Sequence, residues 1–170
     1  GFSISVSFAD DKKDDHEDHD HDHDHAEKIA GPNGGRVFTS VEPHLEFLVT
    51  EDRKVKITAL DDHNKPIAIA EQSVRVTGGD RSNPTRLSFA KEGTVLVSDA
   101  AFPAGNDFPV VVQIKPSGDA KSVMEKFNLN LVDCPTCDYL EYACTCDHSH
   151  DHDHDDHDHD HKEKGAKKKG

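Results

Sequence analysis

Residues 44–60 read HLEFLVTEDRKVKITAL, and this stretch decides the fold class of the chain. Apolar side chains occupy alternate positions on both sides of a polar turn sequence, TEDRK. They are Leu45, Phe47, Val49, Val55, Ile57 and Ala59. An alternation of period two places these side chains on one face of an extended strand. The stretch therefore predicts two half-buried strands joined by a tight reversal.

The same alternation recurs as far as residue 132. Its further apolar positions are Val74, Val76, Leu87, Phe89, Val95, Val97, Val110, Val112, Ile114, Phe127, Leu129 and Leu131. Turn-forming sequences such as DDHNKP, TGGDRSNP and FPAGNDFP separate them. About seven to nine short strands at this spacing predict an all-β fold, a single antiparallel immunoglobulin-like sandwich over residues 31–132. No stretch predicts a long amphipathic helix.

Two runs of histidine and aspartate flank this region, HEDHDHDHDH at residues 16–25 and DHSHDHDHDDHDHDH at residues 147–161. The acidity lies in these tails. Residues 1–30 hold 10 acids and 3 bases (−7) and residues 147–161 hold 7 aspartates (−7), whereas residues 31–132 hold 13 acids and 12 bases (−1). Such composition offers almost no apolar surface to offset the entropy of ordering. We therefore expect disordered His/Asp-rich tails at residues 10–30 and 147–161.

The histidines of the two tails indicate metal binding. Neutral imidazole is the commonest side-chain ligand of first-row divalent metals, and a flexible tract can bend several donors around one ion. We expect Zn²⁺ as the main metal, with Ni²⁺ or Cu²⁺ as alternatives, because calcium prefers oxygen and would leave the histidines without a role. The proposed ligands are His16, His19, His21, His23, His25, His148, His150, His152, His154, His157, His159 and His161.

The two remaining histidines predict structural positions. His44, in VEPHLEF, begins a strand, and His63, in LDDHNKP, lies in a turn exposed to solvent. The sequence contains no nucleophile elbow, no phosphate-binding loop and no H-E-x-x-H motif. We therefore expect a protein that is not an enzyme.

Four cysteines precede the second tract in DCPTCDYLEYACTC, residues 133–146. Cys134, Cys137, Cys144 and Cys146 have a spacing that can close four thiolates around one tetrahedral Zn²⁺ or gather Cu(I). In an oxidising compartment the same cysteines would form two disulfides, with the first pair joined crosswise to the second. Both interpretations of this Cys-rich knot remain open at this point.

The two ends of the sequence bear on location. GFSISVSFA at residues 1–9 ends in the small residues Ser7 and Ala9, which predicts the remnant of a secretory signal and hence a periplasmic or secreted protein, although it also alternates like a strand. The lysine-rich end at residues 162–170 is expected to be a solvated tail, with contact to an anionic membrane surface as the weaker alternative. A net charge of −14 argues against nucleic acid as a partner.

The order of His/Asp tract, GPNGGRVF and VEPHLEFLVTEDRKVKITALDDHNKPI resembles a module of exported heavy-metal-handling proteins. These are the amino-terminal regions of heavy-metal efflux adaptor subunits and small periplasmic proteins. The resemblance covers residues 16–70, and GPNGGR is its sharpest motif. The chain lacks the hairpin and lipoyl-like segments of such adaptors. The resemblance therefore implies a soluble relative, with a metal transporter or efflux system as a partner.

Together these observations predict an exported, non-enzymatic protein that buffers, sequesters or delivers Zn²⁺, Ni²⁺ or Cu²⁺ through its two tails. The alternative is an extracellular adhesion or interaction module whose sandwich binds a partner while the tails only solvate it. Deleting both tails would distinguish the two, because only the second protein would keep its function.

Overall fold

The structure is a computed structural model, and it describes residues 29–146. The predicted signal remnant, both His/Asp tracts with their twelve proposed ligands, and the lysine-rich end lie outside the described residues. Residues 29–146 comprise the predicted sandwich and the Cys-rich knot. No helix within them is long and apolar enough to cross a lipid bilayer.

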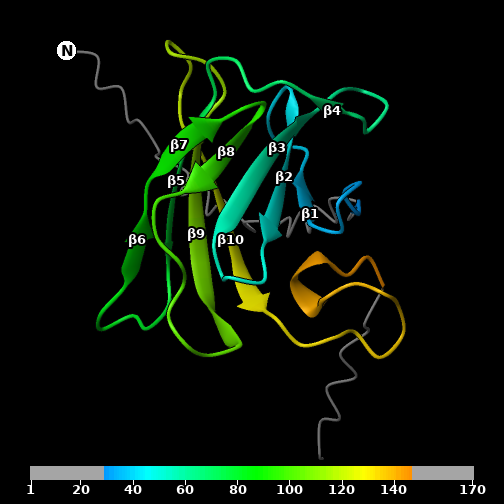
Figure 1. Ribbon diagram of the computed structural model, residues 1–170, viewed down its shortest axis with the longest axis vertical. Helices are drawn as coiled ribbons and strands as arrows, with labels where there is room; N and C mark the ends of the chain where they lie inside the picture. The colour runs from blue at the N-terminus through cyan, green and yellow to red at the C-terminus, as the bar shows by residue number, and fades with distance from the viewer. Residues whose placement is uncertain (1–28, 147–170) are drawn as a thin grey trace, which may run out of the picture.

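The first sheet contains six strands (Figure 1). They are β1 (Arg36–Phe38), β2 (His44–Val49), β3 (Val55–Leu60), β4 (Pro66–Ile67), β7 (Phe89–Glu92) and β8 (Val95–Ser98). Their order is β1-β2-β3-β8-β7, and β4 pairs with one end of β3. The hairpin predicted from residues 44–60 is β2 and β3, which pair from His44 opposite Leu60 to Val49 opposite Val55.

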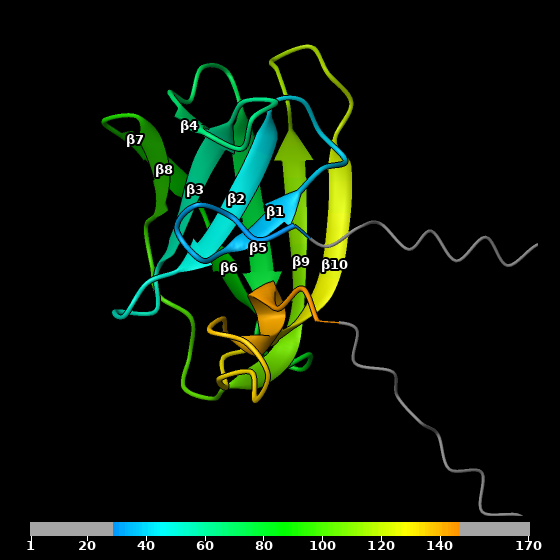
Figure 2. The same cartoon turned by 90° about the vertical axis from the view of Figure 1, so that its right-hand side faces the viewer.

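The second sheet contains four strands in the order β10-β9-β5-β6. They are β5 (Ser73–Gly78), β6 (Thr85–Leu87), β9 (Asp107–Lys115) and β10 (Val123–Asn130). Every strand pair in both sheets is antiparallel. The two sheets face each other as layers in Figure 2. The prediction of an all-β, antiparallel two-sheet fold is confirmed.

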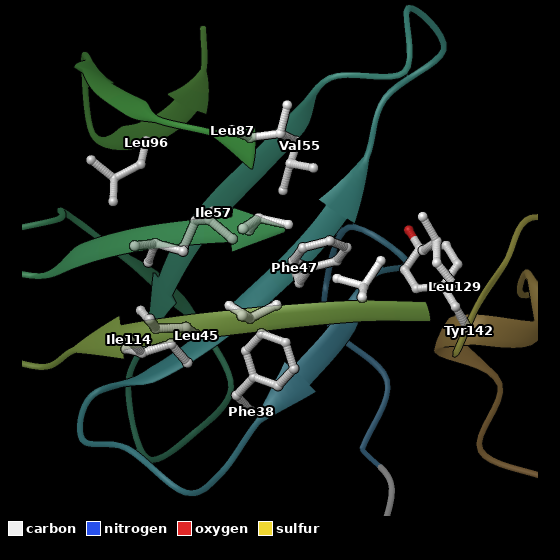
Figure 3. Packing of buried hydrophobic residues seen from close by; sticks show 14 of the residues in the cluster. Phe38, Leu45, Phe47, Val55, Ile57, Leu87, Leu96, Ile114, Leu129 and Tyr142 are labelled. Atoms are coloured by element: carbon white, nitrogen blue, oxygen red, sulfur yellow. The ribbon is translucent and has the colours of Figure 1, made fainter. Parts of the chain in front are cut away.

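The core lies between the two layers, where the alternating apolar residues of both sheets meet (Figure 3). Leu45, Phe47 and Ile57 enter it from the first sheet, and Val112 and Ile114 enter it from the second, each with no exposed surface. Side chains buried in this way supply most of the favourable free energy of folding. The period of two in the sequence therefore identified the core correctly on these strands.

Three phenylalanines and a tyrosine close one part of the core. The ring of Phe47 meets that of Phe127 edge to face, with centroids 5.4 Å apart, and meets that of Tyr142 at 6.2 Å. Phe38 lies 6.0 Å from both Phe47 and Phe127. These separations are favourable for tilted aromatic pairs. Because Tyr142 belongs to the cysteine-containing segment, that segment contributes to the same core as the strands.

The structure departs from the predicted strand pattern at two places. Leu87 and Phe89 were predicted to share one strand, but Ser88 separates β6 in the second sheet from β7 in the first, and its N–H donates to the Asp99 carboxylate over 3.0 Å. In β8, Leu96 and Ser98 face the core, whereas the predicted positions Val95 and Val97 are only half-buried. The Ser98 hydroxyl is satisfied there, because it accepts the Val55 N–H and donates to the Ala100 carbonyl.

Candidate metal centre

The four cysteines lie on a short segment that folds back against the end of β10. The Cys134 N–H donates to the Tyr139 carbonyl over 2.9 Å, and the Glu141 N–H donates to the Val132 carbonyl over 2.9 Å. A single 3₁₀ turn, η1 (Glu141–Ala143), follows and brings Cys144 back beneath Cys134. These main-chain hydrogen bonds close a loop that contains Cys134 and Cys137, and Cys144 and Cys146 follow directly after η1.

The sulfur atoms of Cys134, Cys137, Cys144 and Cys146 converge, and all lie within 4.8 Å of one another. The Sγ of Cys144 is 3.4 Å from that of Cys134 and 3.6 Å from that of Cys137. Tetrahedral Zn–S bonds of about 2.3 Å separate neighbouring sulfurs by about 3.8 Å, whereas a disulfide bond is about 2.05 Å long. The structure contains all four as thiols. This cluster can hold a metal ion.

Thr136, between the first two cysteines, contacts sulfurs from both pairs. Its hydroxyl lies 3.2 Å from the Cys134 Sγ and donates to the Cys146 Sγ over 3.1 Å. Two main-chain groups also point at sulfur: the Thr136 N–H donates to the Cys134 Sγ over 3.5 Å, and the Cys146 N–H donates to the Cys144 Sγ over 3.2 Å. Such donors stabilise negative charge on sulfur, which is the state that binds a metal.

The two buried thiols differ in their acidity. Hydrogen bonds with Thr136 lower the pKa of the Cys134 thiol from 9.0 to about 5, which favours its thiolate form. Burial raises the pKa of the Cys144 thiol from 9.0 to about 12, so this sulfur keeps its proton in the absence of a cation. A divalent ion would displace that proton, because a coordinating thiol is deprotonated.

Tyr142 fixes the cysteine segment to the first sheet. Its hydroxyl accepts the N–H of Val49 at the end of β2 over 3.0 Å, and its carbonyl accepts a guanidinium N–H of Arg36 over 3.4 Å. Burial, together with the negative charge of Glu46, raises the pKa of the Tyr142 phenol, which therefore stays a neutral hydroxyl. The cysteine cluster is consequently held against the first sheet by the contacts of Tyr142.

The GPNGGR motif, residues 31–36, folds around a buried carboxylate. Glu46 has no exposed surface, and one of its oxygens accepts the N–H groups of Asn33 and Gly35 at 2.9 Å each while the other accepts the Asn33 side-chain amide at 2.7 Å. A Cβ atom at Gly31 would collide with the Glu46 side chain, and one at Gly35 would collide with the main-chain carbonyl of Phe47, so these two positions require glycine. We call residues 31–36 together with Glu46 the carboxylate loop.

The carboxylate loop and the cysteine segment lie on the same side of the sandwich. The blue start and the orange end of the described chain are neighbours in both ribbon views (Figures 1 and 2). A Cβ on Gly34 would come within 3.9 Å of the Tyr139 ring. The two ends of the described chain therefore lie on one side of the sandwich.

The four cysteines and the two histidines outside the tracts all lie within the described residues. The cysteines converge as the metal interpretation requires, and His44 begins β2, where it pairs with the Glu42 carboxylate at 3.2 Å. His63 is exposed in the turn between β3 and β4. The twelve tract histidines lie outside residues 29–146.

The residues that support the site are not evident from the sequence pattern. Glu46 occupies a polar position of an alternating strand, so it was expected to face solvent, but the GPNGGR loop covers it. Thr136 and Tyr142 had no distinguishing pattern beyond their place between cysteines. The three glycines of GPNGGR were the one available signal, because closely spaced glycines mark places where the backbone approaches another group.

No protein-family model, no curated protein and no solved structure matches this chain. The interpretation of the site consequently depends on its own residues.

Proposed function

We propose that this protein binds transition metals without catalysing a reaction, and that it does so at two kinds of site. The four cysteines would hold one Zn²⁺ as part of the fold, and the two His/Asp tracts would bind further Zn²⁺, Ni²⁺ or Cu²⁺ that exchanges with the surroundings. The observation that carries the proposal is the convergence of four sulfurs within 4.8 Å.

The surroundings of the cysteines favour a permanent ion over an exchangeable one. Cys134 and Cys144 are buried, and the turn η1 between the pairs is fixed to β2 through Tyr142. Four thiolates with no place for a further ligand are typical of structural zinc, which stabilises a fold. Cu(I) also prefers thiolates, so the metal content of the purified protein decides between them.

The tracts have the opposite properties. Imidazole and carboxylate in a low-complexity sequence allow many interchangeable arrangements around an ion, which gives high capacity and moderate affinity. Ions held in this way can be passed on, and a metal transporter or efflux system is the recipient that we propose. Export from the cytoplasm, proposed from residues 1–9, would place the protein where such ions are collected.

Metal analysis of the full chain, purified without a metal-affinity column, tests both kinds of site. We expect one zinc ion per chain to survive dialysis against a weak chelator, and several more to bind on addition of zinc. A variant with the twelve tract histidines changed to Asn should keep the retained ion and lose the others. A variant with Cys134→Ser and Cys144→Ser should do the reverse.

Counting free thiols tests whether the four cysteines form disulfides in place of a metal site. If the unfolded protein shows no free thiol without reductant, the cysteines form disulfides and the metal centre is rejected. If the histidine variant takes up as much added zinc as the wild type, the tracts are not the exchangeable sites. The alternative of an adhesion module would then gain support, because the tails would only solvate the sandwich.

The pH dependence of the exchangeable ions provides a further check. Imidazole must be neutral to bind metal, its usual pKa is about 6.5, and neighbouring aspartates favour its protonated form. Zinc held by the tracts should therefore be released between about pH 7.5 and 5.5, whereas ions held by aspartate alone would remain until nearer pH 4. Retained zinc in the wild type and in the histidine variant, measured across this range, separates the two ligand sets.

A further inference from the structure

The outer face of the four-stranded sheet is basic. Its outward positions include four cations, Arg75 on β5, Arg86 on β6, Lys115 on β9 and Lys126 on β10, and all four are exposed. We call these four residues the basic face. The only acid at an outward position of these strands is Asp107, which accepts a hydrogen bond from Asn128. Residues 31–132 are nearly neutral overall, so their charge is distributed unevenly.

The pairing of the strands places two of these cations, Arg86 and Lys126, in one row across the sheet. Arg86 lies opposite Thr77, Thr77 opposite Val111, and Val111 opposite Lys126. The two cations at the ends of this row are three strand spacings apart, or about 14 Å at the backbone. No ion pair joins any of the four to an acid within residues 29–146.

The surface between the cations is hollowed and partly apolar. One hollow of about 530 Å³ is lined by Arg81, Lys126, Pro109 and Asn128, and another of about 380 Å³ by Arg75, Arg86, Val111, Gln113 and Met124. Met124 is 57% exposed. A sheet face with cations around these hollows suits an extended anionic chain that lies across the strands.

We propose that the acidic tract at residues 147–161 of this same chain docks on the basic face. The tract has seven aspartates, seven histidines and no lysine or arginine, so it is strongly acidic where its imidazoles are neutral. In an extended chain, aspartates four residues apart, such as Asp156 and Asp160, are separated by about 13.5 Å, close to the spacing of the cation row. Alternate residues point to opposite sides, so docking through aspartates would turn the neighbouring histidines away from the sheet.

The connection of the tract favours it over other occupants. It begins one residue after Cys146, on a segment that packs at the end of β10, and β10 itself contributes Lys126. Fifteen residues can extend about 50 Å, which exceeds the length of any strand in the sheet. Attachment also gives an effective concentration in the millimolar range, above that of a separate acidic partner. The amino-terminal tract leads instead into β1 of the other sheet.

Zero-length carbodiimide cross-linking of the dilute full-length protein, followed by mass spectrometry, tests the proposal. At low ionic strength we expect Lys115 and Lys126 to be joined to aspartates of residues 147–161 within one chain. Lys65 and Lys91, exposed on the six-stranded sheet side, serve as internal controls and should show few such links. The links should be lost in about 0.5 M salt, because exposed charges are then screened.

Two matched variants separate attraction from mere proximity. The double variant Arg75→Gln and Arg86→Gln keeps both reactive lysines but removes half of the positive charge, and should lower the yield of tract links at Lys126 by about five-fold. The control variant Lys65→Gln and Lys91→Gln removes two charges elsewhere and should leave that yield unchanged. Circular dichroism confirms that both variants are folded.

Several outcomes would overturn the proposal. Absence of tract links at both Lys115 and Lys126 would do so, as would equal links at Lys65 and Lys91. Links to acids of residues 10–27, or between separate molecules, would assign the basic face to another occupant. Links confined to the lysines of residues 162–170 would mean that the tract pairs with its own neighbour. Docking does not require the tract to bind metal, so these results are independent of the proposed function.

Discussion

The carboxylate loop and the cysteine segment lie on the same side of the sandwich but are held together in different ways. In the loop, both oxygens of Glu46 accept N–H groups from residues 33 and 35, three hydrogen bonds of 2.7 to 2.9 Å in all. In the segment, sulfur atoms contact chiefly one another and Thr136, at 3.1 to 3.6 Å. Thiols are weak donors and weak acceptors, so these contacts stabilise the fold much less.

This difference indicates where a metal ion would matter. In the carboxylate loop both oxygens of Glu46 have N–H donors, and every buried side-chain nitrogen or oxygen in residues 29–146 has a hydrogen-bond partner. The cysteine segment has two buried sulfurs with opposite pKa shifts and only weak contacts among them. A cation would therefore add little stability to the loop and much to the segment.

The first prediction concerns Glu46→Ala. The substitution leaves the N–H groups of Asn33 and Gly35 without an acceptor in a buried place and removes hydrogen bonds to a charged group. We expect the free energy of unfolding to fall by about 4 kcal/mol. Urea unfolding followed by circular dichroism measures it. Addition of zinc or of a chelator should not change the size of this loss.

Two variants control this measurement. Glu46→Gln keeps one acceptor oxygen for the two main-chain N–H groups, and the Asn33 amide can rotate to face the new NH₂ group, so the loss should be nearer 1.5 kcal/mol. Glu42→Ala removes an exposed carboxylate just before the start of β2 and should lower the free energy of unfolding by less than about 0.5 kcal/mol. If all three substitutions cost the same, the carboxylate loop is not organised by Glu46.

The second prediction concerns removal of the metal. With free zinc about a hundredfold above its dissociation constant at the cysteines, a strong chelator should lower the free energy of unfolding by about 3 kcal/mol. Cys144→Ser should reproduce this loss and should then be insensitive to the chelator. The histidine variant is the suitable background, because its tracts cannot bind zinc through imidazole.

Reductant in place of chelator distinguishes the alternative. Loss of stability on reduction, with no response to chelator, would mean that disulfides hold the segment. If neither a metal ion nor disulfides hold the cysteine segment, its stability would respond to neither chelator nor reductant. The proposed difference between this segment and the carboxylate loop would then be rejected.

The third prediction concerns the connection between the segment and the sheet. Tyr142→Phe keeps the buried ring against Phe47 but removes the hydroxyl that accepts the Val49 N–H. We expect a loss of about 1 kcal/mol, and somewhat weaker zinc retention because the cysteines are then less firmly positioned. Tyr139 is half-buried, and within residues 29–146 its hydroxyl makes no hydrogen bond of this kind, so Tyr139→Phe is the matched control and should have a smaller effect.

The fold was predictable where a local pattern controls it. Alternation identified β2, β3, β5, β9 and β10, and the residues of TEDRK and DDHNKP form the turns that their composition predicted, with Arg53 and Asn64 in the left-handed region. Alternation predicted one continuous strand through Ser88, but the chain passes there from the second sheet to the first. Such a change of sheet depends on packing against the other sheet, which a local pattern does not show. Alternation also failed in β8, where four small or apolar residues in succession leave the inward face undetermined.

The site was predictable in its ligands but not in its supports. The spacing of the cysteines predicted that four sulfurs could meet, since each pair is local and only one loop has to close. The burial of Glu46 depends on a loop that crosses it from thirteen residues earlier, and the role of Tyr142 depends on Val49, far away in the sequence. Contacts between residues so far apart produce no periodic pattern in the sequence, so they could not be predicted from it.

The last and smallest effect compares Glu46 with an exposed carboxylate of the same chemistry. In the turn after β3, the Asp61 carboxylate accepts the N–H groups of His63 and Lys65 at 2.9 Å each. The hydrogen bond from Lys65, followed by that from His63, lowers the pKa of Asp61 below its usual 3.8. Water can replace both donors at this surface, so Asp61→Ala should cost far less than Glu46→Ala.

The pH dependence of Asp61→Ala identifies its origin. Because the folded pKa lies below the unfolded one, the contribution of Asp61 is fully present above about pH 4 and is lost as the pH falls through the folded pKa. The stability difference between wild type and Asp61→Ala should therefore be constant from pH 7 to 5 and should shrink below pH 4. Thermal unfolding of both proteins across this range measures it, with Asp62→Ala as the neighbouring control. A difference that stays constant down to pH 2 would mean that the ionised carboxylate does not stabilise this turn.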